Sequence, residues 1–280
     1  DGKLIFTADI PLGYTYYVKE TSPAPGFATT DQVQEFTFEY GGAEKEILSY
    51  EFTFEDESTT VEFTKTSLID GKAVEGAKLK VTDESGNTVD EWTSGKEPHI
   101  IKELTVGKKY TMTETLPADG YVTAESITFT VEDISEVQKV EMKDDVTKVQ
   151  ISKTDISGKE LPRAKLTILD KDGKTVESWT SEEKPHYIEM LPIGEYTLRE
   201  ETAPDGYLVA EDVKFTVKDT GEIQKVVMKD EVKPTETPTE TPTETPTPET
   251  QKGTGTTKTS MSPKTGDNTP ILFWILLAGA

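Results

Sequence analysis

The stretch VQISKTD, residues 149–155, carries a lysine where the strand pattern predicts an apolar side chain. Side chains alternate between the two faces of a β-strand, so Val149, Ile151 and Lys153 share one face. Two of these three side chains are apolar and are expected to face a core. The strand pattern therefore places a charged side chain, that of Lys153, on the face expected to be buried.

Internal repeats determine the predicted domain organisation. AKLKVTDESGNTVDEWTS (77–94) matches AKLTILDKDGKTVESWTS (164–181) along its whole length. Further matches on both sides extend the repeat. We therefore predict two complete units, at residues 60–146 and 147–232.

A partial unit is predicted before them, at residues 1–59. YYVKETSPAPGF (16–27) matches YTMTETLPADGY (110–121), and YEFTFEDE (50–57) matches the terminal strand of a complete unit. The partial unit thus starts near its middle and lacks its first three strands. The sequence is treated as a fragment of a longer protein.

Each complete unit is predicted to be all-β. In the unit 147–232, seven short segments rich in Val, Ile, Thr and Tyr are separated by turn residues. They read VQISKTD, AKLTILD, TVESWTS, HYIEML, EYTLREE, DVKFTV and IQKVVMKD. Seven short strands in one unit favour an immunoglobulin-like sandwich of two sheets. After these units, the Pro/Thr-rich stretch 233–260 cannot form a core and is predicted to be a disordered spacer.

Composition excludes several classes of partner and site. The formal net charge of −23 argues against nucleic acid and against an anionic membrane surface as partners. The absence of cysteine excludes disulfides, thiolate nucleophiles and cysteine-ligated metals. We predict no metal site and no cofactor.

The alternation found at Lys153 places further charges on apolar strand faces. The set is Lys65, Glu114 and Asp144 in the first complete unit, Lys153, Glu200 and Asp230 in the second, and Glu20 and Asp56 in the partial unit. These charges could lie at strand ends and reach water. They could instead form a buried salt bridge, whose net stabilisation is small because desolvation offsets the attraction.

Condensation is a third interpretation of these charges, and we favour it. Burial disfavours the charged forms of amines and carboxyls, so a neutral Lys153 could attack a protonated Asp230. Glu200 could shuttle the protons. Fixed geometry supplies the effective concentration that such a reaction needs. The product is an uncharged amide, which removes the cost of burying the ion pair.

The motifs ISKTD, AKLTILD, YTLREETAPDGY and VVMKD resemble the SpaA-type, or collagen-adhesin B-type, domains of Gram-positive surface proteins and pilins. The resemblance covers both complete units and the partial one. It implies tandem prealbumin-like sandwiches, each with a self-formed isopeptide bond between a lysine and an Asn or Asp. The implied amines are Lys65 and Lys153, the proton shuttles are Glu114, Glu200 and Glu20, and the acceptors are Asp144, Asp230 and Asp56, whose partner lysine is missing.

A second resemblance concerns residues 261–280. The pentapeptide Ser262-Pro263-Lys264-Thr265-Gly266, with an apolar run after it, resembles the L-P-x-T-G sorting signal read by sortases. It implies a sortase as partner, cleavage after Thr265, and transfer of Thr265 to an amine of peptidoglycan or of a pilin. The run ILFWILLAGA (271–280) is shorter than the roughly 20 residues that span a bilayer, so we expect a truncated hydrophobic segment.

These predictions favour the stalk of an adhesin-like surface protein, extracellular and covalently attached to a Gram-positive cell wall. The only chemistry expected is self-catalysed isopeptide formation, so the chain is not predicted to be an enzyme. The unknown host or matrix ligand would bind a region before Asp1. A basal or minor pilin is the first alternative, although no Y-P-K motif is present. Part of a wall-anchored enzyme, such as a glycosidase with paired carboxylates, is the second.

Overall fold

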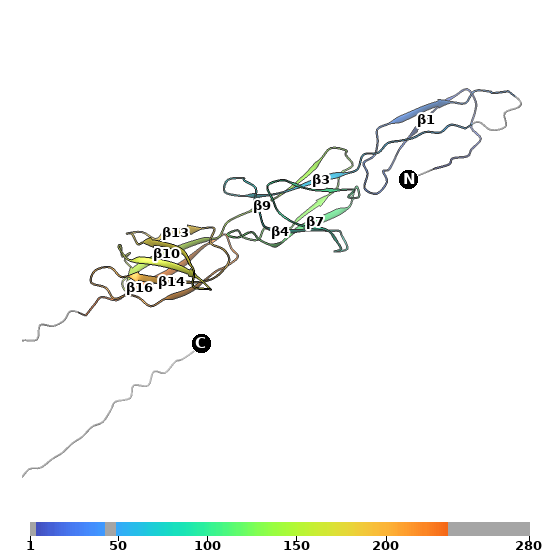
Figure 1. Cartoon of the computed structure of the whole chain (residues 1–280). Helices are drawn as coiled ribbons and strands as arrows, with labels where there is room; N and C mark the ends of the chain where they lie inside the picture. Colours follow the sequence, from blue (N-terminus) through green and yellow to red (C-terminus); the bar gives the residue numbers. More distant parts are fainter. Residues whose placement is uncertain (1–3, 43–48, 235–280) are drawn as a thin grey trace, which may run out of the picture. The chain divides into compact units, whose positions relative to one another are not determined.

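The computed structural model describes residues 4–42 and 49–234. The predicted sorting signal and all but the first two residues of the predicted spacer lie outside the described residues. The described residues are organised by β-strands (Figure 1). None of them forms a helix long and apolar enough to cross a membrane.

The first complete unit is built from seven strands in two sheets. They are β3 (Thr60–Ser67), β4 (Lys78–Thr82), β5 (Thr88–Thr93), β6 (His99–Lys102), β7 (Lys109–Leu116), β8 (Ile127–Thr130) and β9 (Gln138–Asp144). One sheet has the order β6-β3-β9 and the other the order β5-β4-β7-β8. The pair β3–β9 is parallel and the remaining pairs are antiparallel. The first and last strands of the unit are therefore direct neighbours.

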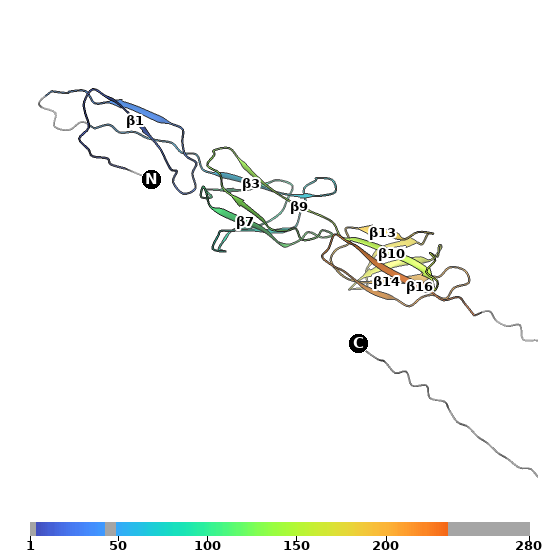
Figure 2. The same cartoon turned by 180° about the vertical axis from the view of Figure 1, so that it is seen from behind.

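The second complete unit repeats this architecture. Its strands are β10 (Lys148–Asp155), β11 (Lys165–Asp170), β12 (Thr175–Thr180), β13 (His186–Glu189), β14 (Gly194–Thr202), β15 (Val213–Val217) and β16 (Ile223–Asp230). The sheet orders are β13-β10-β16 and β12-β11-β14-β15. The parallel strands β10 and β16 lie side by side in both views (Figure 2). All seven strands predicted for this unit are confirmed.

Each core lies between the two sheets of its unit. In the second unit, Val149 and Ile151 of β10 and Met228 of β16 pack with Ile168 and Leu198 of the facing sheet. The equivalent residues of the first unit form a separate cluster. Alternation predicts that Val149, Ile151, Leu198 and Met228 point inward, and the core confirms these four positions.

The partial unit has only two strands, β1 (Thr15–Lys19) and β2 (Val33–Thr37), paired antiparallel. Residues 50–57, which match the terminal strand by sequence, are not in a strand; only the bridge Phe27–Ser58 follows them. The prediction of a terminal strand here is wrong for a physical reason. The strand β9 pairs only with β3, and the described residues contain no counterpart of β3 for the partial unit.

Candidate functional site

Three charged side chains meet in the core of the first complete unit. Lys65 comes from β3, Asp144 from the end of the neighbouring β9, and Glu114 from β7 in the facing sheet. The Lys65 ammonium donates a hydrogen bond to Asp144 Oδ1, and its Nζ lies 3.1 Å from Glu114 Oε1. No side chain of the three is more than 1% exposed. The structure thus brings the three predicted residues together.

The second complete unit holds the same arrangement. Lys153 donates to Asp230 Oδ1, and its Nζ lies 2.9 Å from Glu200 Oε1. These side chains are equally buried. The interpretation in which the charges reach water at strand ends is therefore wrong for both complete units. We call each set of Lys, Glu and Asp a triad.

Strand register explains why the triads form. In the parallel pair β10–β16, Lys153 lies opposite Met228 and Asp155 opposite Asp230. Asp230 is thus two residues further along than the partner of Lys153, on the same face of the sheet. The pair β3–β9 has the same register, with Lys65 opposite Met142. The glutamate then reaches the lysine from across the sandwich.

A backbone contact fixes each glutamate, and the strand pattern did not predict it. The Ala124 amide donates to Glu114 Oε2 at 2.6 Å, and the Ala210 amide donates to Glu200 Oε2 at 2.7 Å. Both donors lie in non-strand segments ten residues after the glutamate. One carboxyl oxygen is thereby held, and the other is left facing the lysine.

Burial dominates the electrostatics of the acceptors. It raises the pKa of Asp144 to about 6, against the opposing effect of the hydrogen bond and charge of Lys65. Burial likewise raises the pKa of Asp230, again opposed by Lys153. The nearby glutamate adds to the increase in both units. A carboxyl with a raised pKa has a larger protonated fraction near neutral pH, which is the form that can lose hydroxide as water.

The partial unit contains two of the three predicted residues. Glu20 Oε2 accepts from the Thr30 amide at 3.1 Å, which is the contact that holds glutamate in the complete units. Asp56 Oδ1 is buried and has no hydrogen-bond partner among the described residues. No lysine of the described chain forms an ion pair with either carboxyl. The predicted half-site is therefore present without an amine.

The two histidines have structural surroundings. His99 stacks on Trp92 with ring centroids 4.2 Å apart, and its Nε2 lies 2.8 Å from Asp90. His186 stacks in the same way on Trp179, 4.4 Å away, and contacts Glu177. Both tryptophans pack against the core of their own unit. These contacts agree with a packing role for the four rings.

A protein-family model agrees with this architecture. The family model of the SpaA prealbumin-like fold domain matches residues 59–146 and 147–232, more than half of the chain. The chain belongs to this family of SpaA prealbumin-like domains. A search of curated proteins found no match.

Among solved structures, the Bacillus anthracis TIE protein is 28% identical, with a TM-score of 0.47. The match covers 79% of this chain and 42% of the TIE chain, so this chain spans less than half of that protein. The shaft pilin SpaA of Lactobacillus rhamnosus GG is 14% identical over 62% of this chain and 98% of its own, with a TM-score of 0.31. The minor pilin GBS52 of Streptococcus agalactiae is 12% identical over 64% and 98%, with a TM-score of 0.31.

Proposed function

We propose that each complete unit closes itself with a Lys–Asp amide, and that these crosslinked units form the stalk of a wall-anchored, pilin-like surface protein. The observation that carries the proposal is the pair of buried triads at equivalent positions of two units. A buried ion pair gains little net stability, because desolvation offsets the attraction. An amide removes both charges and keeps the contact.

The reaction balances without a cofactor or an oxidant. Neutral Lys153 Nζ attacks the side-chain carbonyl carbon of protonated Asp230, and a carbon–nitrogen bond forms. Glu200 accepts a proton from the nitrogen and returns it to the departing hydroxyl group. One water leaves, and Glu200 ends in the state in which it began. Lys65, Glu114 and Asp144 perform the same steps in the first unit.

Strand order gives the crosslink a mechanical role. Because β3 and β9 are parallel neighbours and are the terminal strands of the unit, pulling the chain ends loads them in shear. An amide between Lys65 and Asp144 carries that load through covalent bonds. The residues between them then lie outside the path of the force. Units joined in series in this way suit a stalk that has to resist extension.

Crosslinking also stabilises each unit at equilibrium. Lys65 and Asp144 are 79 residues apart, and Lys153 and Asp230 are 77 residues apart. Closing a loop of this length restricts the unfolded chain and stabilises the fold by about 4–5 kcal/mol in the chain-entropy model. A domain without cysteine can obtain in this way the covalent support that disulfides give to other extracellular domains.

Attachment to the cell wall is the second part of the proposal, and it concerns residues outside the described ranges. A sortase would cleave between Thr265 and Gly266 and join Thr265 to a peptidoglycan or pilin amine. Incubation of the chain with a sortase and an amine nucleophile should transfer residues 1–265 to that amine. The variant Pro263→Ala should not react. Failure of the unmodified chain to react with sortases of several classes would reject this part alone.

Intact mass of the folded chain tests the crosslinks. We expect a deficit of two waters, one for each complete unit. Lys153→Ala or Asp230→Ala should restore one water, and Glu200→Ala should prevent or slow the loss in that unit. The matched substitution of an exposed neighbour, Lys229→Ala, should leave both losses in place. A full, uncondensed mass for the folded chain would reject the crosslinks.

A further inference from the structure

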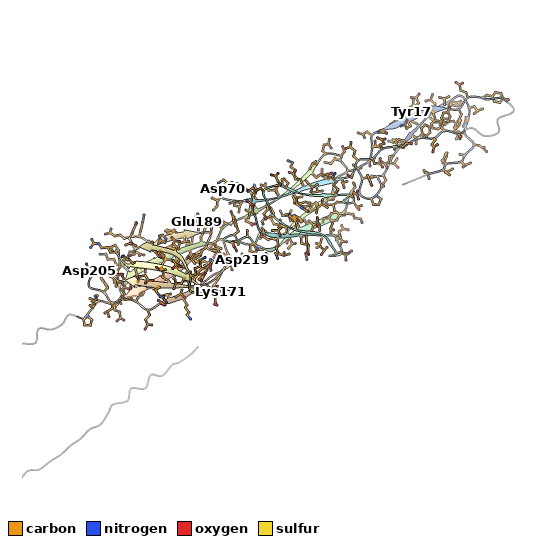
Figure 3. All side chains as sticks on the ribbon, in the orientation of Figure 1. Tyr17, Asp70, Lys171, Glu189, Asp205 and Asp219 are labelled. Atoms are coloured by element: carbon orange, nitrogen blue, oxygen red, sulfur yellow. The ribbon has the colours of Figure 1, made fainter. Side chains whose placement is uncertain are left out.

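The second complete unit contacts the first unit beside the first triad. Asp219 lies between β15 and β16 of the second unit and is labelled there in Figure 3. Its Oδ1 accepts a hydrogen bond of 2.8 Å from the Thr123 amide of the first unit, and we call this hydrogen bond the brace. Thr123 directly precedes Ala124, whose amide holds the proposed shuttle Glu114. Of two adjacent amides, one thus binds the following unit and the other binds the triad of its own unit.

The same pair of contacts recurs between the partial unit and the first unit. The Thr29 amide and hydroxyl donate to the two carboxyl oxygens of Asp133 in the first unit, both at 2.7 Å. The next amide, that of Thr30, donates to Glu20. The two bonds from Thr29 lower the pKa of Asp133, so its carboxylate is ionised near neutral pH and the bonds are charge-assisted. Asp133 and Asp219 are equivalent positions of the repeat, so the brace belongs to both joints.

The segment that carries Asp219 also reaches the acceptor side of the first triad. Lys148 Nζ donates to both carboxyl oxygens of Asp145 at 2.8 Å and to the Gly221 carbonyl at 3.3 Å. Asp145 directly follows the acceptor Asp144, and Gly221 lies two residues after Asp219. One short segment of the second unit is therefore connected both to the backbone that holds the shuttle and to the backbone that carries the acceptor.

Backbone contacts at this joint hold the two units together closely. The fully buried Thr147 donates from its amide to the Gly120 carbonyl of the first unit at 3.0 Å, and from its hydroxyl to the Leu191 carbonyl of the second at 2.6 Å. Gly120 has a φ of +83°, and a Cβ there would lie 2.5 Å from the Met190 carbonyl oxygen. Only glycine allows this approach. The joint is thus a close backbone contact, and it keeps the acidic segment of the second unit against the first.

The second unit shows what the glutamate contact looks like without a brace. Val209 has the place of Thr123 in the repeat, and its amide has no hydrogen-bond partner among residues 4–42 and 49–234. The next amide, that of Ala210, still donates to Glu200 at 2.7 Å. The contact therefore forms without the brace. We expect the brace to determine how firmly the contact is held, and hence the rate of condensation.

We propose that Asp219 is a positioning residue for the triad of the preceding unit, and that it acts through the segment that holds Glu114. The inference rests on the proposed function, because it concerns the rate of the condensation between Lys65 and Asp144. In that step a carbon–nitrogen bond forms, the bond from carbon to the hydroxyl group breaks, and one water leaves. Glu114 carries the proton from the nitrogen to the hydroxyl group. Asp219 takes no part in these bond changes.

The brace should raise the rate because proton transfer depends on exact placement of the shuttle. Glu114 Oε1 lies 3.1 Å from Lys65 Nζ, while its Oε2 is held by the Ala124 amide. Small displacements from hydrogen-bond reach lower the rate of such a step strongly. Anchoring the neighbouring amide to Asp219 restricts the motion of the Ala124 amide. The first crosslink should therefore form fastest once the second unit has folded.

The test follows newly made full chains over time. Chains labelled in a short pulse of cell-free synthesis are quenched in acid at successive times and digested, and mass spectrometry gives the crosslinked fraction of each unit. Asp219→Ala should slow crosslinking of the first unit roughly tenfold and leave that of the second unit unchanged. Asp219→Asn keeps an acceptor oxygen and should restore most of the rate. Glu222→Ala removes an exposed charge three residues away and should change neither rate.

A second measurement separates positioning from misfolding. In chains with Lys65→Met, which cannot crosslink the first unit, adding Asp219→Ala should leave the hydrogen exchange of β4 and β7 unchanged. Faster exchange there, equal slowing of both units, or no rescue by Asp219→Asn would indicate a general structural effect and overturn the proposal. Equal first-unit rates in Asp219→Ala and the unmodified chain would overturn it and leave the crosslinks standing. An unmodified chain that forms neither crosslink would reject the proposed function, and this inference with it.

Discussion

The complete unit 60–146 and the described residues of the partial unit 1–59 contain equivalent shuttle strands and equivalent backbone contacts beside the acceptor aspartate, yet only the complete unit fully buries its carboxyls. Glu114 and Asp144 are fully enclosed, whereas Glu20 and Asp56 remain partly exposed. The described residues of the partial unit contain no counterparts of β3, which carries Lys65, or of β4 and β5. Local sequence therefore builds the acceptor and the shuttle, and strands that are distant in the sequence supply the amine and complete the burial.

The largest expected effect is mechanical. In the crosslinked first unit, force on the chain ends passes through the Lys65–Asp144 amide, so the residues between Lys65 and Asp144 should not extend. In Asp144→Ala the unit should unfold and extend by up to about 270 Å, since 79 residue steps at about 3.4 Å each become available. Single-molecule force spectroscopy on the full chain measures this step.

Lys143→Ala is the matched control for that measurement. Lys143 is the exposed neighbour of Asp144, and it forms an ion pair with Glu141 at the surface. The variant Lys143→Ala should therefore leave the first unit unable to extend under force. If the first unit of the unmodified chain also unfolded with a step of about 270 Å, the result would contradict the crosslink. The complete unit would then have no more covalent support than the partial unit.

The next effect is on the stability of the second unit. Lys153→Met removes the amine while keeping an apolar side chain of similar length. The unit should lose about 4–5 kcal/mol of loop-closure stabilisation, and the two buried carboxyls lose their partner. Peptide-resolved hydrogen exchange in denaturant gives the free energy of unfolding of this unit separately from the first. Lys229→Met should change it little, and an equal loss in the two variants would contradict the role of Lys153.

Sequence was sufficient to predict most of this architecture. Segments rich in Val, Ile, Thr and Tyr between turn residues located the seven strands of the second complete unit, and alternation placed Lys153, Glu200 and Asp230 on inward faces. It could do so because a half-buried strand shows its period directly in the sequence. The internal repeat then identified the equivalent residues of the first unit, which are Lys65, Glu114 and Asp144.

Two features were not predicted, and both depend on distant chain segments. The amides of Ala124 and Ala210 lie in non-strand segments, where no periodicity shows which groups they contact. Residues 50–57 have the pattern of a strand but form none, because a strand needs a hydrogen-bonded neighbour and theirs is absent from the described residues. A periodic pattern indicates which side chains of a segment share a face. It does not indicate whether a neighbouring strand is present to form the hydrogen bonds of a sheet.

A smaller expected effect is the pH dependence of the stability of the first unit, which comes from its acceptor, Asp144. Glu114→Gln should leave Lys65 and Asp144 unjoined. Burial should still raise the pKa of Asp144 above the 3.8 of the free side chain, but without the contribution of Glu114 the pKa should lie below the value of about 6. The folded state then binds more protons than the unfolded state between about pH 4 and 6. The contribution of Asp144 to stability is accordingly largest below pH 4 and falls by less than about 3 kcal/mol as the pH rises to 6.

The crosslinked chain is the control for the pH effect. Its Asp144 is an amide and does not titrate, so this part of the pH dependence should be missing. Denaturant unfolding of the first unit across pH 4–6.5, compared between the two chains, isolates the contribution of Asp144. A difference that stays constant with pH would contradict the burial of an ionisable Asp144 in the unjoined unit.

The smallest expected effect compares one hydrogen bond in two surroundings. Tyr196 and Tyr16 each donate from their hydroxyl to a proline carbonyl at 2.8 Å, that of Pro192 or Pro11. In Tyr196→Phe the carbonyl loses its partner in a partly buried site, so the second unit should lose about 1 kcal/mol. In Tyr16→Phe the site is exposed and water replaces the hydroxyl, so hydrogen exchange of β1 should change by less. Equal losses at the two positions would mean that the strands found only in the complete units have little influence on solvent access, and would contradict the contrast between the two kinds of unit.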